Sequence, residues 1–164
     1  MTQSDLFIKR DRMRYTKDSF SSGLVLLAIV FNVLYFVSIY QTDVGRYYYN
    51  WVIGASIIYN LLFLLTAFLA SQGVKNRKGG YSLTLLVIGL LQIGRIFYLP
   101  AKAYSAPPVE MGEEMLEVMS TSQYTYVVVC LAASAVCCIV AGVSSYISNK
   151  QLAQHMRELE KQSA

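Results

Sequence analysis

Four long stretches of the chain are almost entirely apolar, and shorter polar stretches separate them. The apolar runs cover residues 20–40, 51–70, 81–99 and 126–147. A membrane-spanning helix needs about 20 apolar residues, so each run is long enough to cross a bilayer. Tyrosines and Trp51 lie at the ends of most runs, where interfacial anchors of spanning helices occur. The pattern predicts an all-α integral membrane protein, an up-down-up-down four-helix bundle.

Composition indicates the same fold class. Hydrophobic residues make up 55% of the 164 residues and charged residues 15%, whereas soluble domains average about 45–50% and about 25%. Residues 20–147 then form the transmembrane domain. A basic segment, residues 1–19, precedes this domain, and a tail, residues 148–164, follows it. The connections between the runs are too short for a second domain.

The basic residues are distributed unevenly among the polar segments. Eleven of the 14 lie before the first run, between the second and third runs, or after the fourth. These segments share one side of the membrane if the helices alternate in direction, and short basic loops face the cytoplasm. We therefore expect a multi-pass protein of the cell membrane with both termini cytoplasmic. Because Asp5, Asp11 and Asp18 interrupt the first basic cluster, it indicates anionic lipid rather than nucleic acid.

The connection between the third and fourth runs contains apolar and acidic residues at helical spacing. The apolar positions are Met111, Met115, Val118 and Met119, and the acidic positions are Glu110, Glu113, Glu114 and Glu117. This spacing favours a short amphipathic outer helix lying on the membrane surface. An acidic loop without fixed structure is the alternative. The acidic face differs from the lysine-rich face of lipid-binding helices, so a protein partner fits the segment as well as lipid does.

One polar residue lies near the middle of each predicted span. Drawn antiparallel, the spans bring four of them to one depth: Asn32, Asn60, Gln92 and Ser134. A buried amide in lipid needs a hydrogen-bonding partner, and only neighbouring helices can supply it. We therefore predict a mid-bilayer amide layer, in which each contact contributes about 0.6 kcal/mol.

A second polar cluster, Tyr35, Ser56 and Arg95, lies about one helical turn nearer the outer surface. Each member is three or four residues from an amide of the layer and shares its helix face. An ionisable residue inside a span is a functional hypothesis by default. Three interpretations of Arg95 stay open. It is an anchor reaching the interface, an ion pair with Asp43 or a loop glutamate, or a site for an anionic ligand or lipid head group.

The fourth run carries small residues at every fourth position in two adjacent stripes. The stripes are Ala133, Cys137, Ala141 and Ser145, and Ser134, Cys138 and Gly142. Small residues at this spacing let two helices approach closely. Three uses stay open: packing inside the bundle, self-association, and docking onto a membrane-protein partner.

Residues for catalysis or metal binding are scarce. The one histidine, His155, lies in the tail, and no span contains Asp or Glu. The spans therefore offer no histidine-based metal site, no catalytic triad and no carboxylate for proton coupling. No glycine motif for nucleotides occurs either. We expect no enzyme activity, no metal and no cofactor.

Two hypotheses of function follow. The first is a small non-enzymatic accessory or regulatory subunit of a larger membrane complex, such as a transporter or envelope assembly. The stripes of the fourth run and the acidic segment would supply its docking surfaces. The alternative is a small transporter or ligand-binding membrane protein with an outer-leaflet site around Arg95.

Overall fold

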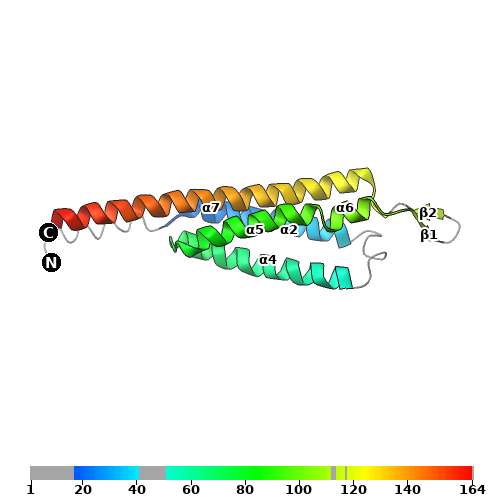
Figure 1. Cartoon of the computed structure of the whole chain (residues 1–164), viewed down its shortest axis with the longest axis horizontal. Helices are drawn as coiled ribbons and strands as arrows, with labels where there is room; N and C mark the ends of the chain where they lie inside the picture. Colours follow the sequence, from blue (N-terminus) through cyan, green and yellow to red (C-terminus); the bar gives the residue numbers. More distant parts are fainter. Residues whose placement is uncertain (1–16, 41–50, 112–113, 117, 164) are drawn as a thin grey trace.

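The structure, a computed structural model, describes residues 17–40, 51–111, 114–116 and 118–163. Within these ranges the long elements are α2 (Ser19–Tyr40), α4 (Trp51–Lys75), α5 (Gly80–Ile96) and α7 (Thr121–Ser163). Shorter elements join α5 to α7, namely α6 (Leu99–Tyr104), β1 (Val109–Met111) and β2 (Glu114–Leu116). The long helices pack side by side as one bundle (Figure 1). The predicted all-α four-helix fold is confirmed.

The described helices contain four segments that are long and apolar enough to cross a membrane. They are Ser19–Tyr40, Gly54–Lys75, Gly80–Tyr104 and Thr121–Glu158. Large apolar side chains cover the outer faces of these helices. Leu61, Leu90 and Val129 are examples, and each is about 60% exposed. In a bilayer such faces contact lipid tails, which are as apolar as leucine. The chain is thus a small multi-pass membrane protein.

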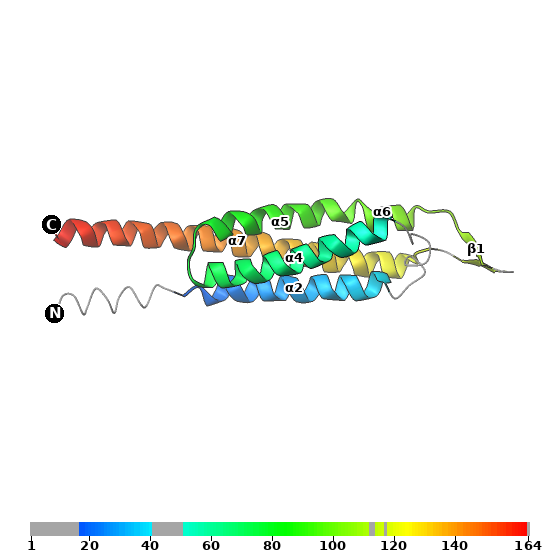
Figure 2. The same cartoon turned by 90° about the horizontal axis from the view of Figure 1, so that it is seen from below.

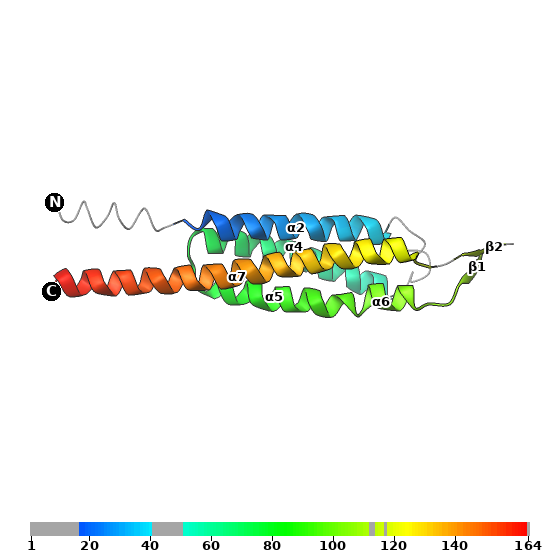
Figure 3. The same ribbon diagram turned by 90° about the horizontal axis from the view of Figure 1, so that it is seen from above.

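Successive long helices run in opposite directions (Figures 2 and 3). Near the start of α5, Ser82 Oγ donates to Ser145 Oγ, late in α7 (2.9 Å). Nearer the end of α5, Gln92 Nε2 donates to Ser134 Oγ, earlier in α7 (3.4 Å). The start of α5 and the end of α7 consequently lie toward the same end of the molecule, and the start of α2 lies toward that end as well (Figures 2 and 3). The opposite end, where α5 stops and α7 begins, is called the α6 end below.

α7 is the longest element and packs against both α2 and α5. It begins at Thr121, before the predicted start of the fourth span, and continues unbroken to Ser163. The expected tail, residues 148–164, therefore continues this helix as far as the structure describes it. α7 projects beyond the other helices (Figure 1).

The small-residue stripes of α7 lie inside the bundle. Ser134, Cys138, Ala141 and Ser145 are buried, and Ala133 and Cys137 are half-buried. A Cβ atom on Gly142 would lie 3.0 Å from the backbone oxygen of Ser82 in α5. Cys138 and Ala141 belong to the core that Val25 and Ala28 of α2 also form. Packing inside the bundle is therefore the use to which the structure puts these stripes.

α5 stops at Ile96, short of the predicted end of the third span at residue 99. The cause is Pro100, whose ring clashes with the carbonyl four residues earlier and which has no N–H to donate. That carbonyl belongs to Ile96. The chain then starts a new helix, α6, with Pro100 in its first turn, where a missing N–H is tolerated.

The described residues of the segment 110–119 do not form the predicted amphipathic helix, so that prediction is wrong. β1 and β2 pair in antiparallel orientation, with Glu110 opposite Met115. A helical segment of about ten residues is marginal without packing. A short helix does precede α7, but it is α6.

Among the described side chains of the predicted helix, Val118 and Met119 join the bundle. They are 5% and 3% exposed and pack in the apolar cluster at the α6 end. Tyr35, Leu99 and Val127 belong to the same cluster. This cluster closes the bundle beside the polar residues described next.

Candidate functional site

The four residues of the predicted amide layer form one hydrogen-bonded network, with one residue from each long helix. Asn32 Nδ2 donates to Asn60 Oδ1 (3.2 Å), and Gln92 Nε2 donates to Asn32 Oδ1 (2.9 Å). Gln92 Nε2 also lies 3.4 Å from Ser134 Oγ, which donates to the backbone oxygen of Ala28 (3.0 Å). All four side chains are 0–1% exposed. The network therefore occupies the centre of the bundle.

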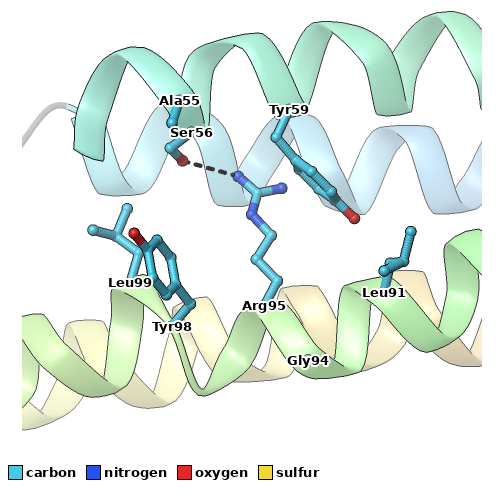
Figure 4. Close-up of a pocket in the computed structure, with 8 residues that line it drawn as sticks. All are labelled: Ala55, Ser56, Tyr59, Leu91, Gly94, Arg95, Tyr98 and Leu99. Atoms are coloured by element: carbon cyan, nitrogen blue, oxygen red, sulfur yellow. Dashed lines mark hydrogen bonds between the residues drawn. The ribbon is translucent and has the colours of Figure 1, made fainter. Parts of the chain in front are cut away.

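Arg95 reaches from α5 toward α4 and joins this network (Figure 4). Its Nη1 donates to Asn32 Oδ1 (3.3 Å), and its Nη2 donates to Ser56 Oγ (3.4 Å). Its Cζ lies 4.3 Å from the ring centre of Tyr35 and 4.8 Å from that of Tyr59. These distances fall within the range of cation–π attraction. The guanidinium is thus held by two hydrogen bonds and two aromatic rings.

The position of Arg95 bears on the three interpretations of this residue. It is only 8% exposed and points into the bundle, so it does not act as an interfacial anchor. No carboxylate among the described side chains pairs with it. Asp43 and the loop glutamates, the ion-pair partners suggested by the sequence, lie outside the side chains that the structure describes. The ion-pair and anionic-ligand interpretations both stay open within the described side chains.

A cavity of about 430 Å³ lies beside the guanidinium, between α4 and α5 (Figure 4). Its lining residues are Ala55, Ser56 and Tyr59 of α4, Leu91, Gly94 and Arg95 of α5, and Tyr98 and Leu99 beyond it. Ligand-binding cavities have volumes of about 300–1,000 Å³ and combine apolar walls with a few polar groups. This cavity has that size and that composition.

Two small residues, one from α4 and one from α5, contribute to the space in this cavity. Ala55 and Gly94 line it, and a Cβ atom added to Gly94 would meet no atom within 4 Å. α4 and α5 also pack less extensively against each other than α5 and α7 do. Leu91 and Tyr98 are 52% and 47% exposed, so the cavity opens on the outer, apolar surface of the bundle.

One polar atom of the amide network has unused hydrogen-bonding capacity. Gln92 Oε1 is buried and makes no hydrogen bond within the part of the chain that the structure describes. An unsatisfied buried polar group costs about 1–3 kcal/mol, so natural proteins keep few of them.

The lining residues define the chemistry that is available. They include one cation, one aliphatic hydroxyl, two phenols and apolar surface, and no carboxylate, histidine or cysteine. No group of three or more potential metal-ligating side chains occurs in the described ranges. An arrangement of this kind suits binding of an anion rather than proton transfer or metal coordination.

The structure brings together all the residues of the predicted polar cluster, and two tyrosines that were not predicted for this cluster also line the cavity. Tyr35, Ser56 and Arg95 meet as their spacing in the sequence indicates. The additional lining residues are Tyr59 and Tyr98. Each lies three residues after a cluster member, Tyr59 after Ser56 and Tyr98 after Arg95, so helical spacing alone places them on the same faces.

Comparison with known proteins gives no family to which the chain can be assigned. No protein-family model matches it, and neither curated proteins nor solved structures give a significant match. Its function must therefore be inferred from the geometry and chemistry of the cavity.

Proposed function

We propose that this chain is a small, non-enzymatic membrane protein that binds an anionic ligand in the cavity between α4 and α5. The observation that carries the proposal is that Arg95 lines the cavity and no described carboxylate neutralises it. An arginine inside a membrane span is energetically costly. A bound anion offsets part of this cost, and charges of this kind mark ligand or ion sites.

The geometry of Arg95 supports the recognition of an anion. Asn32 and Ser56 each accept a hydrogen bond from one N–H group of the guanidinium. The rings of Tyr35 and Tyr59 pack near it and restrict its movement. An arginine has five N–H donors, so these two hydrogen bonds leave others for a ligand. The planar group matches a carboxylate or phosphate through paired hydrogen bonds. A fixed guanidinium loses little freedom when it binds.

Binding explains the site better than transport does. The amide network fills the bundle centre next to Arg95 with four almost fully buried side chains. It leaves the cavity on one flank of the bundle rather than along its axis. Residues 19–40, 54–75, 80–104 and 121–147 of the described helices also contain no Asp or Glu that would couple movement of a ligand to protons.

The accessory-subunit hypothesis is second, because its strongest support has a simpler explanation. Cys138, Ala141 and Gly142 of the small-residue stripes pack inside the bundle against α2 and α5, so these residues are not free for a partner helix. We further propose a cell-membrane location with both termini cytoplasmic. The proposal is supported by Lys75, Arg77 and Lys78, which lie at the end of the bundle opposite the α6 end.

The test is to identify what leaves native membranes with the protein. Wild type, Arg95→Leu and Lys150→Leu are purified in mild neutral detergent, and bound small molecules and proteins are identified by mass spectrometry. Lys150→Leu removes an equal charge from an exposed position far from the cavity. We expect an anionic compound with wild type and Lys150→Leu, and its loss from Arg95→Leu.

Two results would contradict this proposal. Identical compounds bound to all three proteins would mean that Arg95 holds no ligand. A protein partner recovered in equal amount with all three, without any anionic compound, would instead favour the accessory-subunit hypothesis.

A further inference from the structure

The route into the cavity follows from which of its walls are exposed. Leu91 and Tyr98 are about half exposed, and Gly94 is exposed beside them. Leu90, the neighbour of Leu91, is 63% exposed and belongs to the same apolar outer surface. In a membrane this surface faces lipid tails. The opening is therefore lateral, toward the bilayer.

The walls of the cavity are polar at one place and apolar elsewhere. Arg95 and Ser56 form the polar part, where Nη2 donates to the hydroxyl. Ala55, Leu91 and Leu99 form apolar parts of the lining. A small anion would have to give up its hydration shell to enter the cavity. Only the polar part would replace those contacts with water, so its transfer into the cavity is unfavourable. An amphiphile with a charged head and an apolar chain matches both parts.

Arg95 also lies at a depth that a lipid head group can reach. It precedes Pro100, the break before α6, by about one helical turn. At the α6 end, Lys102 Nζ lies 4.7 Å from the ring centre of Tyr98, a lining residue, which brings a second, exposed cation close to the opening. Tyrosine and lysine are residues that gather at the level of head groups.

We infer that the occupant of this cavity is a lipid of the surrounding bilayer that has a net anionic head group. Its phosphate contacts the guanidinium of Arg95, and part of its acyl chain lies in the cavity beside Leu91 and Gly94. The inference rests on the proposed function and names the ligand class for it. It draws on charge complementarity, the lateral opening, and the apolar walls.

The test compares three probes on the full-length protein in neutral detergent. The probes are phosphatidylglycerol, phosphatidylcholine with the same acyl chains, and glycerol phosphate, which has the anionic group without a chain. We expect phosphatidylglycerol to bind about tenfold more tightly than either of the others, a difference of about 1.4 kcal/mol. Native mass spectrometry and calorimetric titration measure these affinities.

Two variants separate the head-group contact from the chain contact. Arg95→Gln removes the charge and is expected to abolish the preference for phosphatidylglycerol over phosphatidylcholine. Gly94→Leu keeps the charge but fills the cavity and is expected to weaken phosphatidylglycerol binding about tenfold. Gly23→Leu is the control, because Gly23 is an exposed glycine on α2 whose added Cβ also meets no atom within 4 Å. Circular dichroism and gel filtration check that each variant folds.

The outcomes distinguish this inference from the proposed function. If glycerol phosphate binds as tightly as phosphatidylglycerol and Gly94→Leu has no effect, the ligand is a soluble anion, and only the lipid inference is overturned. If no anionic probe distinguishes wild type from Arg95→Gln, both proposals are overturned. If Arg95→Gln fails to fold, Gly94→Leu alone decides whether an acyl chain occupies the cavity.

Discussion

Asn32 is the residue on which the polar network depends. Its Oδ1 accepts hydrogen bonds from Gln92 (2.9 Å) and Arg95 (3.3 Å), and its Nδ2 donates to Asn60 (3.2 Å). The amide is neutral, so it meets a hydrogen-bonding need of the guanidinium without neutralising its charge. In a medium of low polarity the remaining charge attracts an anion more strongly than it does in water. Because Asn32 is an amide and not a carboxylate, the positive charge of Arg95 stays available to an anionic ligand.

Replacing Asn32 by Asp should supply the missing negative charge from within the protein. The new carboxylate takes the place of the amide oxygen that accepts from Arg95, so a bound anion must compete with it. We expect the affinity for phosphatidylglycerol to fall about tenfold, measured by the same titration. Gln151→Glu, an added charge on the exposed part of α7, is the control. Unchanged affinity in a folded Asn32→Asp protein would contradict the role given to the unpaired charge.

Much of the polar network could be predicted from the sequence, whereas the cavity could not. In antiparallel spans, counting residues from the ends gives the depth of each side chain, so Asn32 and Gln92 can be assigned to one level from the sequence alone. A cavity depends on how closely two helices approach, which counting does not give. Here Ala55 and Gly94 contribute to the space between α4 and α5, because both are small.

At the scale of elements, the helix pairs of the bundle differ in how extensively they pack: α7 packs extensively against α5 and α2, and α4 packs less extensively against α5. α7 approaches α5 so closely that a Cβ on Gly89 would lie 2.8 Å from Ile139 Cγ1, and one on Gly142 would meet α5. The α4–α5 pair packs less extensively and contains the cavity. The close packing of α5 on α7 holds the helix that carries Arg95 in place. The less extensive packing between α4 and α5 leaves room for a ligand.

A bulky residue in the α5–α7 interface should destabilise the protein. Gly142→Leu forces α7 away from Ser82 and Leu86, because even a Cβ there would lie 3.0 Å from both. We expect the free energy of unfolding to fall by about 1–3 kcal/mol, the usual effect of overpacking. Thermal unfolding in detergent, followed by circular dichroism, measures the change. Gly23→Leu should unfold like wild type, and equal stability of the two variants would show that the interface is looser than described.

The elements that differ from their prediction are those where local breaks override periodicity. Met111, Met115 and Val118 have helical spacing, yet the first two lie in separate strands and Val118 lies in the chain that follows. The segment is too short for its periodicity to stabilise a helix without packing. The long apolar runs were predictable because their length leaves few alternatives in a bilayer.

For the whole molecule, polar and apolar residues are arranged as a membrane requires. Hydrogen-bonded polar side chains such as Asn60 and Ser134 are buried, and large apolar side chains such as Leu62 and Ile58 are exposed. Backbone groups are satisfied within long helices, as the absence of water demands. The distribution of basic residues then decides which end of this bundle faces the cytoplasm.

The orientation gives the last prediction, because it decides from which leaflet a lipid enters the cavity. Short basic loops stay in the cytoplasm, so the turn containing Lys78 should be inside and Ser105, at the α6 end, outside. Both residues are exposed. In a cysteine-free background, an impermeant maleimide should label Ser105→Cys on intact cells and Lys78→Cys only after lysis. The reverse pattern would move the cavity opening to the cytoplasmic leaflet, and both labelling on intact cells would contradict the four-span topology.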